Sequence, residues 1–198
     1  MQIPLHVPQG VQKSWRVEHF EVSASAAKMF NIRASFNSKD KSRYITHGKY
    51  TRLMNGPNVV MSNTPSEIAD HVHFFKIAEG NVLVNGLGLG MVIEAIASKV
   101  KSLTIIEKNE EVIKLVAPTY ASVPNVSILH ADAFEFKPEV GYKYDYVWHD
   151  IWTDICADNL KDMTKLHRKY GKKTHWQGSW RRKECESLRK SERGEKVW

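Results

Sequence analysis

Residues 81–90, Asn-Val-Leu-Val-Asn-Gly-Leu-Gly-Leu-Gly, constrain the fold of this 198-residue chain most, because an apolar run ends there in glycines at every second position. The run at 82–84 is β-branched and typical of a buried strand, whereas the apolar residues after Gly90 have helical character. The glycines therefore lie on a strand-to-helix turn, where the missing Cβ atoms allow a sharp turn and close approach of a ligand to backbone N–H groups. This pattern predicts an α/β fold with a nucleotide-like ligand.

The glycine spacing narrows the choice of ligand. A dinucleotide fingerprint needs G-x-G-x-x-G, but the sixth position counted from Gly86 is Met91, and counted from Gly88 it is Ile93. No Lys-Ser or Lys-Thr pair follows the glycines to hold a β/γ-phosphate and its Mg²⁺. NAD, ATP and GTP are therefore disfavoured.

Three acidic residues follow the later strands that we expect in this fold. Glu107 ends the apolar run 103–106, 21 residues beyond Gly86, where an acid can accept both hydroxyls of a ribose. Asp132 follows a run at 126–130, and Asp150 follows another at 144–148. These intervals fit β-α-β-α-β units, so all three acids are expected at the carboxyl edge of one parallel sheet.

Together these landmarks resemble class I S-adenosylmethionine-dependent methyltransferases. The resemblance implies a Rossmann-like, mostly parallel sheet of order 3-2-1-4-5 and S-adenosylmethionine as cofactor, with Glu107 on the ribose and Asp132 on the adenine amine. Asn85 stands where many members have an acid that holds the methionine amino group. The other implied cofactor contacts are Gly86, Gly88, Gly90, Lys108, Ala133 and Asp150.

The first third of the chain predicts a small β unit. Residues 15–22 suit a strand, 48–62 a hairpin with its turn at 55–58, and 31–43 a polar loop, while 1–13 suit a loose arm. Thr64-Pro65-Ser66-Glu67 has the pattern of a capping box that starts a helix. We expect three parts: an arm and β unit at 1–63, the cofactor-binding domain at 64–180, and a basic helix or tail at 181–198.

Residues 44–155 are also distantly similar to spermidine and spermine synthases, which transfer an aminopropyl group from decarboxylated S-adenosylmethionine. Those synthases usually have an Asp in the glycine turn where this chain has Leu89. They also have Asp-x-x-Asp after the fourth strand, whereas three residues separate Asp150 from Asp154. Methyl transfer is therefore the first expectation, and aminopropyl transfer from the decarboxylated cofactor the second.

The acceptor is narrowed by motifs around the fourth strand. Asp150 is the first candidate to orient or deprotonate an acceptor and Asp154 the second, whereas His149 should point to the opposite face of the sheet. The sequence lacks the Asn/Asp-Pro-Pro-Tyr motif typical of methylation at base or glutamine amines and the Pro-Cys of cytosine C5 methylation. No complete metal site is visible. We therefore expect a small-molecule acceptor and no metal.

Basic residues are concentrated at the end of the chain. Residues 161–198 contain 13 Lys and Arg against 5 Asp and Glu, and Trp176 and Trp180 lie among them. Residues 172–190 could thus bind nucleic acid, or form a solvated face with both tryptophans in the core. A non-catalytic binding module with this basic tail is the alternative to an enzyme.

The remaining expectations concern location and assembly. No signal peptide or membrane-spanning run is visible and the two cysteines form no disulfide pattern, which predicts a cytoplasmic protein. The acceptor pocket is open, or is completed by the N-terminal hairpin or by a second subunit, so a homo-oligomer is a further expectation.

Overall fold

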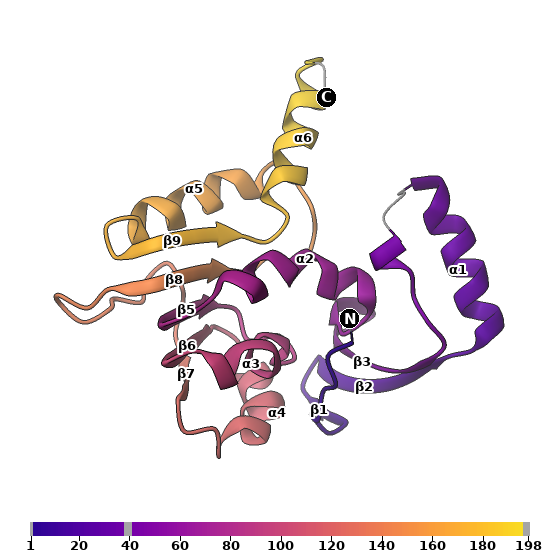
Figure 1. Cartoon of the computed structure of the whole chain (residues 1–198), viewed down its shortest axis with the longest axis horizontal. Helices are drawn as coiled ribbons and strands as arrows, with labels where there is room; N and C mark the ends of the chain where they lie inside the picture. The colour runs from indigo at the N-terminus through magenta and orange to yellow at the C-terminus, as the bar shows by residue number, and fades with distance from the viewer. Residues whose placement is uncertain (1, 38–40, 196–198) are drawn as a thin grey trace.

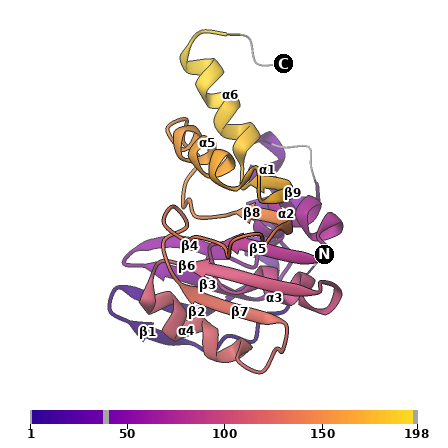
Figure 2. The ribbon, with the colours of Figure 1, turned by 90° about the vertical axis from the view of Figure 1, so that its left-hand side faces the viewer.

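The computed structural model describes residues 2–37 and 41–195, which form two β-sheets with their helices (Figure 1). The larger sheet is wholly parallel, as Figure 2 shows from the side. Its strands in spatial order are β7 (Val126–His130), β6 (Ser102–Glu107), β5 (Asn81–Asn85), β8 (Tyr144–His149) and β9 (Thr174–Ser179). In chain order this is 3-2-1-4-5, which confirms the predicted α/β fold and strand order.

Helices cover both faces of the parallel sheet, which explains why the three consecutive residues 82–84 of its central strand are all apolar and buried. Val82 and Val84 of β5 pack on the face that carries α2 (Pro65–Ile77), α3 (Met91–Ile96) and α4 (Glu110–Tyr120). Leu83 points the other way, toward α5 (Asn159–Tyr170). A short 3-10 turn, η2 (Ala97–Lys99), follows α3, and α6 (Arg182–Glu192) follows β9.

The N-terminal strands form the second sheet, which is antiparallel and has the order β1-β2-β3-β4. The strands are β1 (Gly10–Gln12), β2 (Trp15–Val22), β3 (Gly48–Asn55) and β4 (Asn58–Ser62). The predicted strand at 15–22 and hairpin at 48–62 are confirmed. Val17, Leu53 and Met61 share one hydrophobic core with Phe74 of α2 and Val116 of α4, so apolar packing is continuous across residue 63. The three-part division of the chain stays a prediction.

Two N-terminal predictions were wrong. The supposed loose arm at 1–13 contains β1, and Ile3 and Val7 are buried. The supposed loop at 31–43 contains the end of helix α1 (Ala24–Asn37) and the 3-10 turn η1 (Lys41–Arg43), while 38–40 lie outside the described residues. Asn31 anchors α1, because its side chain exchanges two hydrogen bonds of 2.8 and 2.9 Å with the Ile45 backbone.

The predicted capping box at the start of α2 also needs correction. The Thr64 side chain makes no capping hydrogen bond at the start of α2, because its Oγ1 lies 3.0 Å from Ser62 Oγ. Pro118 lies inside α4, which continues to Tyr120. The capping box therefore does not form, and Glu67 is available for another role.

The tail tryptophans are packed rather than exposed for stacking on bases. Trp176 stacks on Phe74 and Trp148, with ring centroids 6.2 and 6.3 Å apart, and Trp180 is buried. Arg181 pairs with Asp70 and Glu184. This packing agrees with the second of the two possibilities for residues 172–190, in which both tryptophans belong to the core.

None of the described helices is long and apolar enough to cross a bilayer.

Replacing Gly90 by Ala should destabilise the fold by about 3 kcal/mol or more, because two penalties combine. Gly90 has φ +75°, and an added Cβ would lie 2.2 Å from the Tyr120 ring. Gly141 has φ +82° with open space around it, so Gly141→Ala should cost about 1 kcal/mol from backbone strain alone. Urea unfolding of both variants measures the difference; equal losses would show that contact with Tyr120 is unimportant.

Candidate functional site

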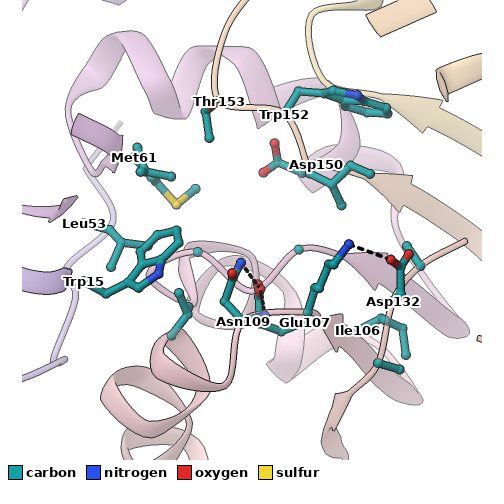
Figure 3. A pocket seen from close by; sticks show the side chains of 18 of the residues that line it. Trp15, Leu53, Met61, Ile106, Glu107, Asn109, Asp132, Asp150, Trp152 and Thr153 are labelled. Carbon is teal, nitrogen blue, oxygen red and sulfur yellow. Dashed lines mark hydrogen bonds and ion pairs between the residues drawn. The ribbon is translucent and has the colours of Figure 1, made fainter. Parts of the chain in front are cut away.

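A cavity of about 260 Å³ lies at the carboxyl edge of the parallel sheet (Figure 3). Its floor is formed by residues at the ends of β5, β6, β7 and β8, and Trp15, Leu53 and Met61 approach it from the N-terminal sheet. Ligand sites in open parallel sheets occur at this edge, beside the strand where the order reverses. The cavity is therefore the candidate site.

Two of the three turn glycines line this cavity, and each permits a close approach. A Cβ on Gly86 would lie 2.0 Å from the carbonyl oxygen of Asp150, so any side chain there would separate the ends of β5 and β8. A Cβ on Gly88 would lie 2.3 Å from Met61 Sδ, and the Leu89 N–H donates to the same sulfur at 3.3 Å. Gly86 holds Asp150 in place, and Gly88 accommodates the N-terminal hairpin.

Glu107 is buried, and its carboxylate faces the cavity. Its Oε2 accepts a hydrogen bond from the Leu87 N–H at 2.9 Å, and its Oε1 accepts from the Asn109 N–H at 2.8 Å and from Asn109 Nδ2 at 3.0 Å. A carboxylate offers about four acceptor sites, so Glu107 can bind the glycine turn and still accept from a ligand. Asn109, although it precedes α4, serves this carboxylate instead of capping the helix.

Asp132 and Ala133 line the same cavity beside Phe134. Asp132 Oδ1 accepts from the Phe134 N–H, and its Oδ2 lies 2.8 Å from Lys108 Nζ. The hydrogen bond from Lys108, with that from Phe134, lowers the pKa of Asp132. The Ala133 N–H makes no hydrogen bond among the described residues. The ionised Asp132 carboxylate, which can accept a hydrogen bond, and the Ala133 N–H, which can donate one, are therefore neighbours at this cavity.

Asp150 also lines the cavity and is largely buried. Burial and then the neighbouring carboxylates of Glu67, Asp70 and Glu107 raise the pKa of Asp150 well above its ordinary value. His71 Nε2 lies 3.7 Å from Asp150 Oδ2, which is too far for a hydrogen bond. Burial lowers the pKa of His71 to about 3, so this imidazole is neutral and does not balance the carboxyl charge.

Glu67 is the site residue that the sequence did not reveal. It lies in the first turn of α2 and lines the cavity together with Asp150. Burial and then nearby Asp70 raise the pKa of Glu67 to about 7, and Arg181 and Arg43 only partly oppose this. In the sequence, Glu67 belongs to a capping-box pattern, which predicts that its side chain bonds to the start of its own helix. The structure does not use this local partner.

Three predicted site residues lie elsewhere. Asn85 does not line the cavity; it is fully buried, and its Nδ2 lies 2.7 Å from Nδ1 of His149, on the face toward α5. Gly90 packs against Tyr120 instead of a ligand, and Asp154 is exposed outside the cavity. Adjacent residues of a strand face opposite sides of the sheet, so Asn85 points to the face opposite that of Val84. Within the described ranges, no three His, Cys, Asp or Glu side chains are arranged to hold a metal ion.

No protein-family profile and no curated protein matches the chain. Solved structures with a similar arrangement include the 23S rRNA methyltransferase ErmE, at 15% identity and TM-score 0.42 over 50% of this chain and 37% of that chain. A complex of DhpI with SAH matches at 16% identity and TM-score 0.43 over 73% and 61%. The CcbJ methyltransferase from Streptomyces caelestis matches at 18% identity and TM-score 0.43 over 54% and 44%.

This chain therefore covers less than two thirds of each of these structures. At such identities and TM-scores the similarities carry no information on function, so the fold assignment rests on the strand order and the site on its own geometry.

Replacing Glu67 by Gln should remove part of the loss of stability that accompanies rising pH. The unfolded carboxyl ionises near its ordinary pKa of 4.5 and the folded one near 7, so native stability falls as the pH rises between these values. The variant should match the parent near pH 4.5 and exceed its free energy of unfolding by about 1 to 3 kcal/mol at pH 8.

Urea unfolding across this pH range tests the prediction. Glu79→Gln, at an exposed position just beyond α2, is the matched control and should leave the pH profile unchanged. Parallel profiles for Glu67→Gln and the parent would contradict the shifted titration.

Proposed function

We propose that this chain binds S-adenosylmethionine in the cavity and acts as a methyltransferase-like enzyme on a small-molecule acceptor. The observation that carries the proposal is the convergence of Glu107, Asp132 and Asp150, from three strand ends, on one cavity beside Gly86. Decarboxylated S-adenosylmethionine, with aminopropyl transfer, is the second choice.

The adenosine end of the ligand fits the residues at β6 and β7. Glu107 already accepts three hydrogen bonds, and its remaining acceptor capacity toward the cavity suits a ribose hydroxyl. The Asp132 carboxylate can accept from the exocyclic amine of adenine, while the unused Ala133 N–H can donate to the neighbouring ring nitrogen. Lys108 keeps Asp132 ionised for this role.

The reacting end would lie toward Asp150 and Glu67. The bound cofactor supplies an electrophilic methyl group on a sulfonium, so the protein has to position the acceptor and remove its proton. Asp150, fixed by Gly86 at the end of β8, would orient the acceptor. Asp154 is exposed, so we withdraw the role in catalysis that the sequence suggested for it.

Adenine recognition gives a direct test of the proposal. We expect calorimetric titration of the parent to show binding of S-adenosylmethionine and S-adenosylhomocysteine and a preference for adenosine over inosine. Asp132→Asn should weaken adenosine binding about 10- to 100-fold, because a charge-assisted hydrogen bond is lost. Asp158→Asn, at an exposed surface carboxylate before α5, is the matched control and should bind like the parent.

The outcomes separate the candidate functions. Failure of the parent to bind either adenosyl ligand would overturn the proposal. Tight binding without turnover on any small-molecule acceptor would favour the non-catalytic module instead. The basic tail supports nucleic-acid binding by such a module less than the sequence suggested, since Trp176 and Trp180 are packed against other side chains. Cytoplasmic location and self-association stay predictions from the sequence.

A further inference from the structure

We propose that the solvent-facing side of α5 is a docking surface for single-stranded nucleic acid. This surface, the α5 stripe, consists of Lys161, Lys165 and Arg168 of α5 and of Lys172 just beyond the helix. It lies outside the cavity, so the inference does not depend on the proposed function. It also differs from the basic tail considered in the sequence, because it is centred on α5 and leaves α6 out.

The spacing of the α5 stripe places its four cations on one face of the helix. Steps of four, three and four residues separate them, which is the spacing of neighbours on a helix surface, and all four are exposed. Gly171 keeps helical dihedral angles, so Lys172 continues the row. The opposite face is buried and consists of Leu160, Met163, Leu166 and Tyr170. At 1.5 Å of rise per residue, the stripe is about 16 Å long.

Positive charge is concentrated on this segment and is poorly neutralised there. Residues 161–173 contain six Lys and Arg against one Asp, whereas residues 182–192 of α6 contain four against three Glu. The cations at the start of α6 have acidic partners, since Arg182 pairs with Glu186. In the stripe, Lys161 pairs with an exposed Asp158, but Arg168 and Lys172 make no ion pair among the described residues. The α5 stripe is therefore suited to a polyanion.

The composition of the α5 stripe favours nucleic acid over other anionic partners. Protein interfaces are centred on buried apolar or aromatic anchors, and helices that lie on membranes insert an apolar face. Within the described part of the chain, every large hydrophobic side chain that is exposed lies outside 159–173. The stripe therefore offers no anchor for a protein or a bilayer, while its regularly spaced cations suit a row of phosphates.

The position of α5 in the fold favours a single strand over a duplex. α5 packs on β8 and β9 with α6 beside it, and Figure 1 shows it lying along β9. A helix that reads duplex DNA protrudes into the major groove, whereas the apolar side of α5 belongs to the core. A flexible single strand can follow a flat cationic face. The stripe also reaches the cavity, because Lys165 Nζ lies 4.8 Å from the ring centroid of Phe134, which lines it.

Salt-dependent binding of a fluorescent 12-nucleotide oligothymidylate tests the inference by anisotropy. Four phosphate contacts predict that the logarithm of the association constant falls with the logarithm of salt concentration with a slope of about −3. The variant Lys161→Gln/Arg168→Gln/Lys172→Gln should bind at least about 10-fold more weakly at low salt. Its slope should be smaller in magnitude by about 2, because three of the four contacts are lost.

The matched control removes the same charge from α6. Lys183→Gln/Arg189→Gln/Lys190→Gln changes three exposed cations and should keep the affinity within about threefold of the parent, with the same slope. Urea unfolding checks that both variants keep the stability of the parent. Equal losses of affinity in the two variants would show that net charge alone attracts the oligonucleotide, and would overturn the inference.

Two further probes identify the partner. A duplex of the same length and vesicles containing phosphatidylserine are titrated under the same conditions. Tighter binding of the parent to either probe than to the single strand would overturn the inference and assign the α5 stripe to that partner. Absence of salt-dependent binding to the oligothymidylate would also overturn it.

Discussion

The close approach of Gly86 to the Asp150 carbonyl is the constraint on which the site depends. The strand pairing of β5 with β8 continues one step beyond His149, through the hydrogen bond from the Asp150 N–H to the Asn85 carbonyl at 2.8 Å. A Cβ at Gly86 would occupy the place of the Asp150 oxygen. Only glycine therefore lets both strands end at the same level, with the glycine turn and Asp150 on one cavity.

Glu107 extends this arrangement to the next strand. Its carboxylate accepts from Leu87 in the glycine turn and from Asn109 at the start of α4, so one buried side chain connects the ends of β5 and β6. A buried carboxylate is tolerated because backbone donors satisfy it. The group that we assign to ribose binding is thus also a structural support, and its position is fixed before any ligand arrives.

The carboxyl groups of Glu67, Asp70 and Asp150 differ from Glu107, because their burial reduces the stability of the fold. Asp70 is neutralised by Arg43, from before β3, and by Arg181, from the segment before α6, so distant parts of the chain converge on α2. Burial raises the pKa of Glu67 and of Asp150, and the same two arginines only partly oppose this at Glu67. Ionised carboxyls without full neutralisation reduce stability, and functional sites are where carboxyls with shifted pKa values are most often found.

The sequence by itself determined the strands of the parallel sheet and the positions of Glu107, Asp132 and Asp150 at their ends, because apolar periodicity is local and the carboxyl ends of parallel strands meet at one edge. The strand order was what the resemblance to a known family implied. The tertiary structure decided which side chains face the cavity: Asn85 turns toward His149, Gly90 packs on Tyr120, and Glu67 leaves its helix cap for the cavity. It also placed the N-terminal sheet over the site and formed α1, whose anchor on Ile45 lies outside its own segment. These features depend on contacts between residues far apart in the chain, and no local pattern specifies them.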